Sequence, residues 1–247
     1  MTKDQVYSSR PSGVRPSEVT VANGSKFIGA TFLYLALALL ITFAVVGGMG
    51  ALFSFALHDG SEASAAIFLK VFIGALILYI PVMLWVHITA ARGGKTVGPA
   101  FFLYSIVLGV MISPLCVVLD FWTIIIAFGT TCLAFGLMAL IAWGTKKNLS
   151  TLAVIAFGLI IGALIISLVN LILTLVGVGS SMYWLVSFLF FAAIMLLTIV
   201  DLNHVKQIAM SGYGTKNLAL LCALNLYVDF IYIFIRLLMI IASIRGK

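Results

Sequence analysis

The chain has 247 residues, of which 64% are hydrophobic and 9% are charged. Soluble globular domains contain roughly 45–50% apolar and about 25% charged residues, so a mean hydropathy of +1.27 is too high for a chain that hides its apolar residues in a soluble core. The composition indicates an integral membrane protein and excludes a separate soluble catalytic domain. The 14 basic residues behind the net charge of +7 are spread along the chain and form no patch for nucleic acid.

The first segment, residues 1–26, is polar and contains two prolines, several serines and four basic residues. We predict a disordered tail here rather than a signal peptide, because the first apolar run begins only at Phe27 and is too long for the apolar core of a signal peptide. Residues 27–247 are then expected to form one transmembrane domain.

Seven apolar runs follow the tail, near residues 27–57, 66–91, 99–118, 121–143, 151–177, 183–203 and 217–243. Each reaches the roughly 20 residues that a helix needs to cross the hydrocarbon core, and none alternates with the period of two that marks a membrane β-strand. The runs predict an all-α polytopic membrane protein with seven transmembrane helices. The first run is so long that its helix must tilt, kink or project.

The basic residues predict the orientation. With a cytoplasmic N-terminus, ten basic residues lie on the cytoplasmic side, those beyond the tail being Arg92, Lys95, Lys146, Lys147, Lys206 and Lys216. Only Lys70, Arg245 and Lys247 lie on the opposite side. The positive-inside rule therefore favours a cytoplasmic N-terminus, in a bacterial inner membrane or an organelle membrane. The two C-terminal charges argue the other way, so six spans with a re-entrant seventh segment remain an alternative.

Asp229 is the most unusual charge, because it lies at the middle of the last apolar run. On insertion scales an aspartate there costs roughly 2.5–3.5 kcal/mol, and such residues generally face a bundle interior and mark an ion or proton pathway. The alternative is an aspartate that only fixes helix packing through hydrogen bonds. Asp201, at the cytoplasmic end of the sixth run, is by itself equally consistent with an ordinary interfacial charge.

Two basic groups accompany these aspartates. Arg236 follows Asp229 by seven residues and so lies about two turns further along the same helix face. It either pairs with a polar group, competing for an aspartate, or extends its charged end to the membrane surface. His204 lies near a helix end, where a lone histidine is more often a surface or packing group than a ligand.

Motifs of enzymes and resident metals are absent from the sequence. It contains no HExxH, no GxSxG and no phosphate-binding loop, so we expect no enzymatic activity and no cofactor. Cys116, Cys132 and Cys222 are isolated and give no metal or redox motif. Gly158 and Gly162 form a GxxxG pattern, which we interpret as a helix-packing contact.

Four segments resemble the Bax inhibitor family, the transmembrane Bax inhibitor motif proteins. Residues 224–231 (LNLYVDFI) resemble its C-terminal LxLYxDFI signature, and residues 201–206 (DLNHVK) its acidic sixth-helix end. Residues 145–150 (TKKNLS) resemble its loop before the fifth helix, and residues 95–101 (KTVGPAF) the segment that opens its third helix. Their order and spacing agree with the family from the first apolar run to the end of the chain.

The resemblance implies a fold in which the last helix is surrounded by the other six. It also implies a pH-controlled calcium leak through the pair Asp201 and Asp229, with Arg92 as the basic latch of the closed state. Arg236 falls earlier than the basic residue usual in the family. Two carboxylates close together in a low-dielectric site resist being ionised together, so they are expected to titrate as a pair. Protonation would weaken the contact with Arg92 and favour an open pore.

We therefore expect a pH-regulated calcium-permeable leak channel. Calcium and protons would be its ligands, with weak, transient calcium binding at Asp201 and Asp229, and the lipid bilayer and other membrane proteins would be its partners. Two alternatives remain. One is an interaction protein that modulates stress, cell death or a membrane protease. The other is a proton-coupled carrier of small solutes, which also needs buried carboxylates.

Overall fold

The computed structural model describes residues 24–58, 62–92, 96–145, 149–176, 183–212 and 214–245. Its helices are α1 (Gly24–His58), α2 (Glu62–Ala91), α3 (Val97–Val118), α4 (Phe121–Gly144), α5 (Ser150–Leu175), α6 (Tyr183–Ser211) and α7 (Lys216–Arg245). All seven are long and apolar enough to cross a membrane. The predicted all-α polytopic architecture is confirmed. Helix α1 begins at Gly24, slightly before the predicted start, and the rest of the predicted tail lies outside the described residues.

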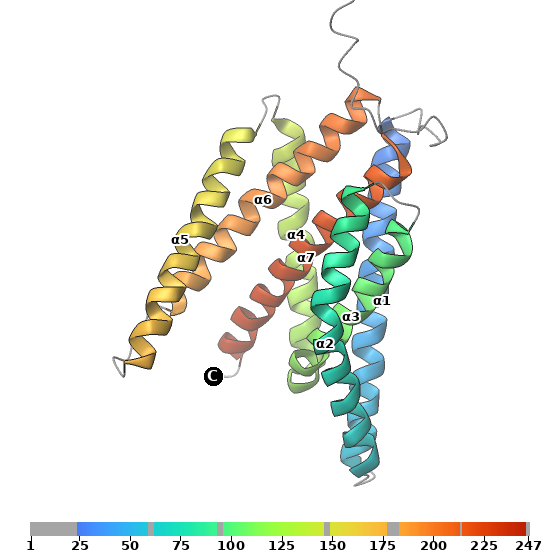
Figure 1. The fold of residues 1–247 in the computed structure, drawn as a ribbon, viewed down its shortest axis with the longest axis vertical. Coiled ribbons are helices and arrows are strands. Elements are labelled where there is room, and N and C mark those ends of the chain that lie inside the picture. Colours follow the sequence, from blue (N-terminus) through green and yellow to red (C-terminus); the bar gives the residue numbers. More distant parts are fainter. Residues whose placement is uncertain are drawn as a thin grey trace, which may run out of the picture.

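Helix α7 forms the centre of the bundle. It packs against α1, α2, α3, α4 and α6, and its fully buried side chains include Leu224, Leu226, Tyr227, Ile233 and Phe234. Helix α5 packs against α6 and stands at the periphery (Figure 1). The expected central position of the last helix is therefore confirmed, with five helices around it in place of the expected six.

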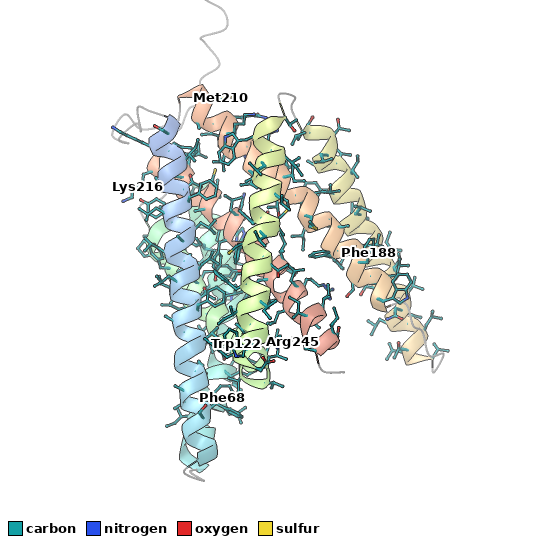
Figure 2. The ribbon with its side chains drawn as sticks, turned by 180° about the vertical axis from the view of Figure 1, so that it is seen from behind. Phe68, Trp122, Phe188, Met210, Lys216 and Arg245 are labelled. Atoms are coloured by element: carbon teal, nitrogen blue, oxygen red, sulfur yellow. The ribbon has the colours of Figure 1, made fainter. Side chains whose placement is uncertain are left out.

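Helix α7 also settles the question of the re-entrant segment. Its 30 residues form one continuous α-helix, which is about 45 Å long and exceeds the roughly 30 Å of the hydrocarbon core. Lys216 and Arg245 lie at opposite ends of it (Figure 2). The re-entrant alternative is wrong, because nothing breaks the helix and turns the chain back.

Helix α1 projects, as one of the three predicted outcomes for the long first run. It continues without a break over 35 residues, and its C-terminal end extends beyond most of the bundle together with the start of α2 (Figure 1). The rings of Phe53 and Phe68 pack at this extension, with centroids 5.3 Å apart. The projecting part is therefore a helical hairpin held by an aromatic contact.

Glycines have opposite surroundings in two parts of the bundle. At Gly109 of α3, a Cβ atom would lie 2.9 Å from the Thr42 carbonyl oxygen of α1. The two helices can therefore approach this closely only because residue 109 is a glycine. At Gly158 and Gly162 of α5, a Cβ atom would meet nothing within 4 Å. The interpretation of that GxxxG pattern as a packing contact is wrong for the described part of the chain.

Charged side chains cap both ends of α4. At its start, the Asp120 carboxylate accepts hydrogen bonds from the Thr123 hydroxyl and the Thr123 backbone N–H, the latter at 3.0 Å. At its end, Lys206 Nζ donates to the carbonyl oxygens of Trp143 and Thr145, at 2.8 and 2.9 Å. Both charges have the sign that a helix end favours. Lys206 also ties α4 to α6 at the end of the bundle where α7 begins.

Candidate functional site

Asp229 of α7 is a buried acid at the centre of the bundle. Only 9% of the residue is exposed, and its Oδ2 atom has no hydrogen-bond partner among the described residues. Buried polar atoms are usually hydrogen-bonded, and an unpaired one destabilises a fold. Asp229 is thus an exception to this rule at one of its two carboxyl oxygens.

Thr198 of α6 contacts Asp229 from the neighbouring helix. Its side chain is fully buried, and its hydroxyl donates to the Ile194 carbonyl oxygen at 2.8 Å while lying within hydrogen-bonding reach of the Asp229 carboxyl group. A hydroxyl has one proton to donate. The hydroxyl therefore donates either to the Ile194 carbonyl oxygen or to the Asp229 carboxyl group, and it links Asp229 to α6.

Asp201 lies one turn beyond Thr198 on α6 and is half-buried. It is close enough to two groups of α7, Asp229 and Cys222, for their charges to interact. Cys222 precedes Asp229 by seven residues, so both belong to one face of α7. The structure thus places both predicted aspartates at the α6–α7 interface, on facing sides of the two helices.

The predicted latch residue lies apart from the pair. Arg92 follows the end of α2, is exposed, and forms no ion pair with Asp201 or Asp229. Within the described residues the ion pair is a different one, between Arg245 and Asp120 at the far end of α7. The contact of Arg92 with an aspartate is not made in this conformation and stays a prediction.

The two remaining predicted residues also lie outside the pair. His204 is exposed on the turn of α6 after Asp201 and lines a hollow of about 130 Å³ together with Ser150 and Gln207. Arg236 is half-buried and is not ion-paired with Asp229, so it does not compete for that aspartate here. It lines two larger hollows beside α7.

Tyr227 is a site residue that the sequence analysis missed. It stands two residues before Asp229 and therefore points to nearly the opposite face of α7. Its hydroxyl lies 2.6 Å from the Thr42 hydroxyl of α1, and its ring packs edge-to-face on Phe101 and Tyr104 of α3. These contacts hold α7 against α1 and α3 while Asp229 faces α6. Tyr227 belongs to the motif that carries the resemblance, but no spacing in the sequence indicates Thr42 as its partner.

The described residues contain no cluster of three or more His, Cys, Asp or Glu side chains that could hold a resident metal ion. Calcium takes about six to eight oxygen ligands. The two aspartates supply part of that set, so water or backbone carbonyl groups would have to complete the coordination of a passing ion.

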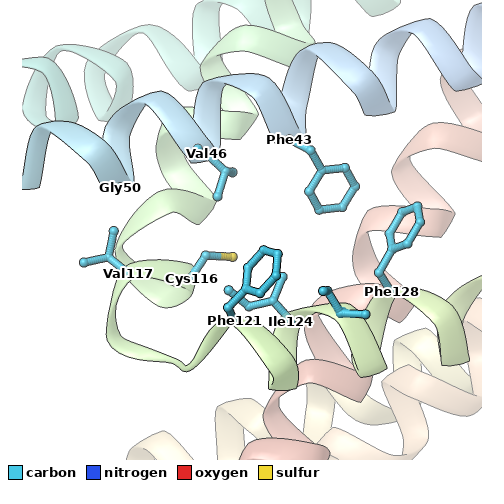
Figure 3. Close-up of a pocket in the computed structure, with 10 residues that line it drawn as sticks. Phe43, Val46, Gly50, Cys116, Val117, Phe121, Ile124 and Phe128 are labelled. Atoms are coloured by element: carbon cyan, nitrogen blue, oxygen red, sulfur yellow. The ribbon is translucent and has the colours of Figure 1, made fainter. Parts of the chain in front are cut away.

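A separate hollow of about 490 Å³ lies between α1, α3 and α4. Figure 3 shows the side chains of Phe43, Phe121 and Phe128 around it, together with the thiol of Cys116. Among the described residues, no aspartate, glutamate, histidine, lysine or arginine lines it. This hollow has the chemistry of a lipid-facing groove rather than that of an ion pathway.

Comparison with known proteins identifies the family. The model of the family described as "Inhibitor of apoptosis-promoting Bax1" matches residues 24–246. Inner membrane protein YbhL of Escherichia coli (strain K12) is 32% identical over 150 residues, which cover 59% of this chain and 62% of YbhL. The match thus spans less than two thirds of that relative.

Two further relatives extend the coverage. An uncharacterized membrane protein of Streptococcus pyogenes serotype M1 is 31% identical over 173 residues, covering 69% of this chain and 73% of its own. An uncharacterized protein of Rickettsia prowazekii is 26% identical over 227 residues, covering 89% and 90%. Because the family model covers every described helix, the chain belongs to the Bax inhibitor family and is a multi-pass integral membrane protein.

Proposed function

We propose that this protein is a pH-regulated, calcium-permeable leak channel whose N-terminus is cytoplasmic, and that Asp201 and Asp229 form its proton-sensitive gate. One observation carries the proposal: a buried carboxyl oxygen of Asp229, which has no hydrogen-bond partner among the described residues, belongs to an acid that interacts with a second acid, Asp201, across the α6–α7 interface. Calcium and protons are the proposed ligands, and neither a cofactor nor an enzymatic reaction is part of the proposal.

The gate follows from the electrostatics of two acids. Two neighbouring carboxylates in a low-dielectric site resist being ionised together, so the pair binds and releases protons as a unit. Ionisation would attract Arg92 from the end of α2 and close the pathway. Protonation removes that attraction and shifts the population towards the open state.

The proposal predicts that calcium flux rises as the pH falls and that this dependence needs both acids. Flux into liposomes that contain a calcium-sensitive dye should be measured over a pH series for the unmodified protein, Asp201→Asn and Asp229→Asn. Each variant removes one ionisable group, so we expect flux that no longer follows the pH.

Asp120→Asn is the matched control for these variants. It makes the same chemical change at an exposed residue outside the α6–α7 interface, and it should conduct with the unmodified pH profile. If Asp201→Asn and Asp229→Asn also keep that profile, the aspartate pair is not the gate. If no form of the protein conducts calcium, the channel proposal itself fails.

A proton-coupled carrier is the second candidate, because a hollow of about 460 Å³ between α2, α3 and α7 is large enough for a small solute. A carrier would give a flux that saturates with solute and follows an imposed proton gradient. A leak channel would conduct without saturating in the same range.

A further inference from the structure

Arg236 of α7 lies where two hollows meet. One hollow, of about 460 Å³, lies between α2, α3 and α7, and the other, of about 600 Å³, lies between α6 and α7; Arg236 and Met239 line both. Figure 1 shows α7 running between α2 and α6 in this part of the bundle. Arg236 is therefore accessible to a ligand from hollows on two sides of α7.

The guanidinium of Arg236 has no anionic partner in the described part of the chain. Among those residues the ion pair joins Arg245 to Asp120, and Asp229 lies two turns, or about 10.5 Å, back along the helix axis. Arg236 stands nine residues before the end of α7, roughly 14 Å along the axis, and so lies within the membrane-spanning part. An arginine at such depth is generally paired or extends its charged end to the membrane surface, and with no acid of the described chain beside it Arg236 is open to an anionic ligand.

The hollow between α2, α3 and α7 has the chemistry of an anion site. Its polar side chains besides Arg236 are Tyr79, His87, Tyr104 and Tyr232, and the part of the chain that the structure describes places no aspartate or glutamate in its lining. The Nδ1 atom of His87 lies 2.8 Å from the Met83 carbonyl oxygen. A carbonyl only accepts, so Nδ1 carries the proton and Nε2 of the neutral ring is an acceptor. Arg236 and the tyrosine hydroxyls are therefore the donors that this hollow offers to an anion. The Tyr104 hydroxyl is hydrogen-bonded to Tyr79, which leaves the hydroxyls of Tyr79 and Tyr232 as donors. A fixed cation and these two hydroxyls suit a single anionic group.

The hollow between α6 and α7 has the chemistry of an alkyl-chain site. Its lining includes Trp184, which is 68% exposed, and Phe188, which is 62% exposed. Figure 2 labels Phe188 on the part of α6 that lies away from the end with Met210. In a membrane-spanning helix, exposed aromatic side chains face lipid, so this hollow opens to the bilayer. A ligand arriving from the bilayer carries an apolar chain.

We propose that Arg236 and these two hollows form a binding site for an anionic amphiphile with a single charged group. Its phosphate or carboxylate group pairs with Arg236 and lies in the polar hollow, and its alkyl chain lies along the α6–α7 hollow against Trp184. The site is independent of the proposed calcium conductance, since it involves neither Asp201 nor Asp229. Either proposal can therefore fail without the other.

Trp184 provides the reporter for the test, because bromine atoms on an alkyl chain quench tryptophan fluorescence on contact. The full-length protein in neutral detergent is titrated with brominated phosphatidylglycerol, brominated phosphatidylcholine of the same chains, and a brominated fatty acid. The difference between the unmodified protein and Trp184→Phe isolates the signal of Trp184. We expect half-maximal quenching by an anionic amphiphile at a concentration about tenfold lower than for phosphatidylcholine, since a charge-assisted contact is gained.

Variants of α7 assign the preference to Arg236. Arg236→Gln should abolish the preference for the anionic amphiphile, and Arg236→Lys should keep part of it. Arg245→Gln is the matched control, because Arg245 is on the same helix and lines neither hollow; it should keep the whole preference. Tighter binding of phosphatidylglycerol than of the fatty acid identifies a phosphate ligand, and the reverse order identifies a carboxylate.

A competition experiment on the unmodified protein needs no variant at Arg236. An alkyl phosphate without bromine should relieve the quenching by brominated phosphatidylglycerol, and a neutral alkyl glycoside of equal chain length should not. Equal quenching by the anionic and zwitterionic lipids, equal relief by both competitors, or an unchanged preference in Arg236→Gln would each overturn the proposed site.

Discussion

Helices α5 and α7 are both long enough to span a membrane, yet their surroundings are opposite. In an 18-residue apolar stretch of each helix, 67% of the residues are buried in α7, compared with 11% in α5. Helix α5 is the more apolar of the two and contains no ionisable residue, whereas α7 contains Asp229 and Arg236. In lipid the most apolar helix is free to stand outside, while a helix with polar groups needs neighbours that shield them. The central helix is therefore the less hydrophobic one, the reverse of the rule for soluble cores.

Removal of a large side chain should show the largest difference in stability between a variant on α7 and a variant on α5. Phe234 of α7 is fully buried and packs edge-to-face on Phe43 of α1 at 5.3 Å. Phe234→Ala should lower the free energy of unfolding by about 3–5 kcal/mol, because a cavity remains. Phe157 of α5 is 57% exposed, and Phe157→Ala should change stability by less than about 0.5 kcal/mol, as surface substitutions do. Thermal unfolding in detergent measures both, and equal losses would contradict the contrast.

A hydroxyl pair gives a finer comparison. Tyr227→Phe removes the 2.6 Å hydrogen bond to Thr42 and keeps the ring, so it should lower stability by about 1 kcal/mol, the usual net contribution of a buried hydrogen bond. Thr174→Val on α5 is the control, because Thr174 is bonded within its own helix, to the Asn170 carbonyl oxygen. That variant should stay close to the unmodified protein.

A double-mutant cycle assigns the loss to the bond between α1 and α7. If the hydrogen bond accounts for the effect, Tyr227→Phe should cost little once Thr42→Val is present, since coupled residues are not additive. Losses that simply add would mean that the two hydroxyls stabilise the bundle separately, and that α7 is held against α1 by its apolar contacts alone.

The sequence predicts much of the fold, because a transmembrane helix leaves a long apolar run that composition reveals. All seven spans were found in this way, with α1 starting slightly early at Gly24. The re-entrant alternative was wrong because it rested on Arg245 and Lys247, and a continuous α7 simply places Arg245 on the far side. Charge counts predict sides of the membrane, but they carry no information on whether a helix is broken.

The sequence predicts less of the site, because helical periodicity gives a face without naming the neighbour that covers it. Asp229 was visible from its insertion cost alone. Its contact with Thr198, its charge interaction with Asp201, and the hydrogen bond between Tyr227 and Thr42 depend on which helices α7 packs between. A threonine in an apolar run gives no signal of its own, so Thr198 and Thr42 could not have been chosen from the many others.

At the exposed end of α7, as on α5, substitution of a side chain should change stability little. The ion pair at this end gives the smallest predicted effect. Arg245 Nη1 lies 3.8 Å from Asp120 Oδ2, with side chains that are 44% and 59% exposed, and exposed ion pairs stabilise proteins little. Arg245→Gln should therefore leave the unfolding temperature nearly unchanged. Asp120→Ala should lower it more, because the start of α4 loses its cap and the buried Thr123 loses the acceptor of its N–H and hydroxyl.

The contribution of Asp120 to the stability of the fold should also depend on pH, and it should decrease in acid. Hydrogen bonds from the Thr123 hydroxyl and backbone N–H, and then the charge of Arg245, hold the pKa of Asp120 below its usual value. The folded state thus binds this proton less readily than the unfolded state. The stabilisation is complete above the unfolded pKa of about 3.9 and is lost as the pH falls through the lower folded value. The difference in unfolding temperature between the unmodified protein and Asp120→Ala should therefore stay constant near neutral pH and shrink only in acid. Asp120→Asn, whose amide oxygen still caps the helix, should show a smaller loss of stability and no such acid dependence. If the difference in unfolding temperature between the unmodified protein and Asp120→Ala changes between neutral and mildly acidic pH, another group titrates at this end of α7.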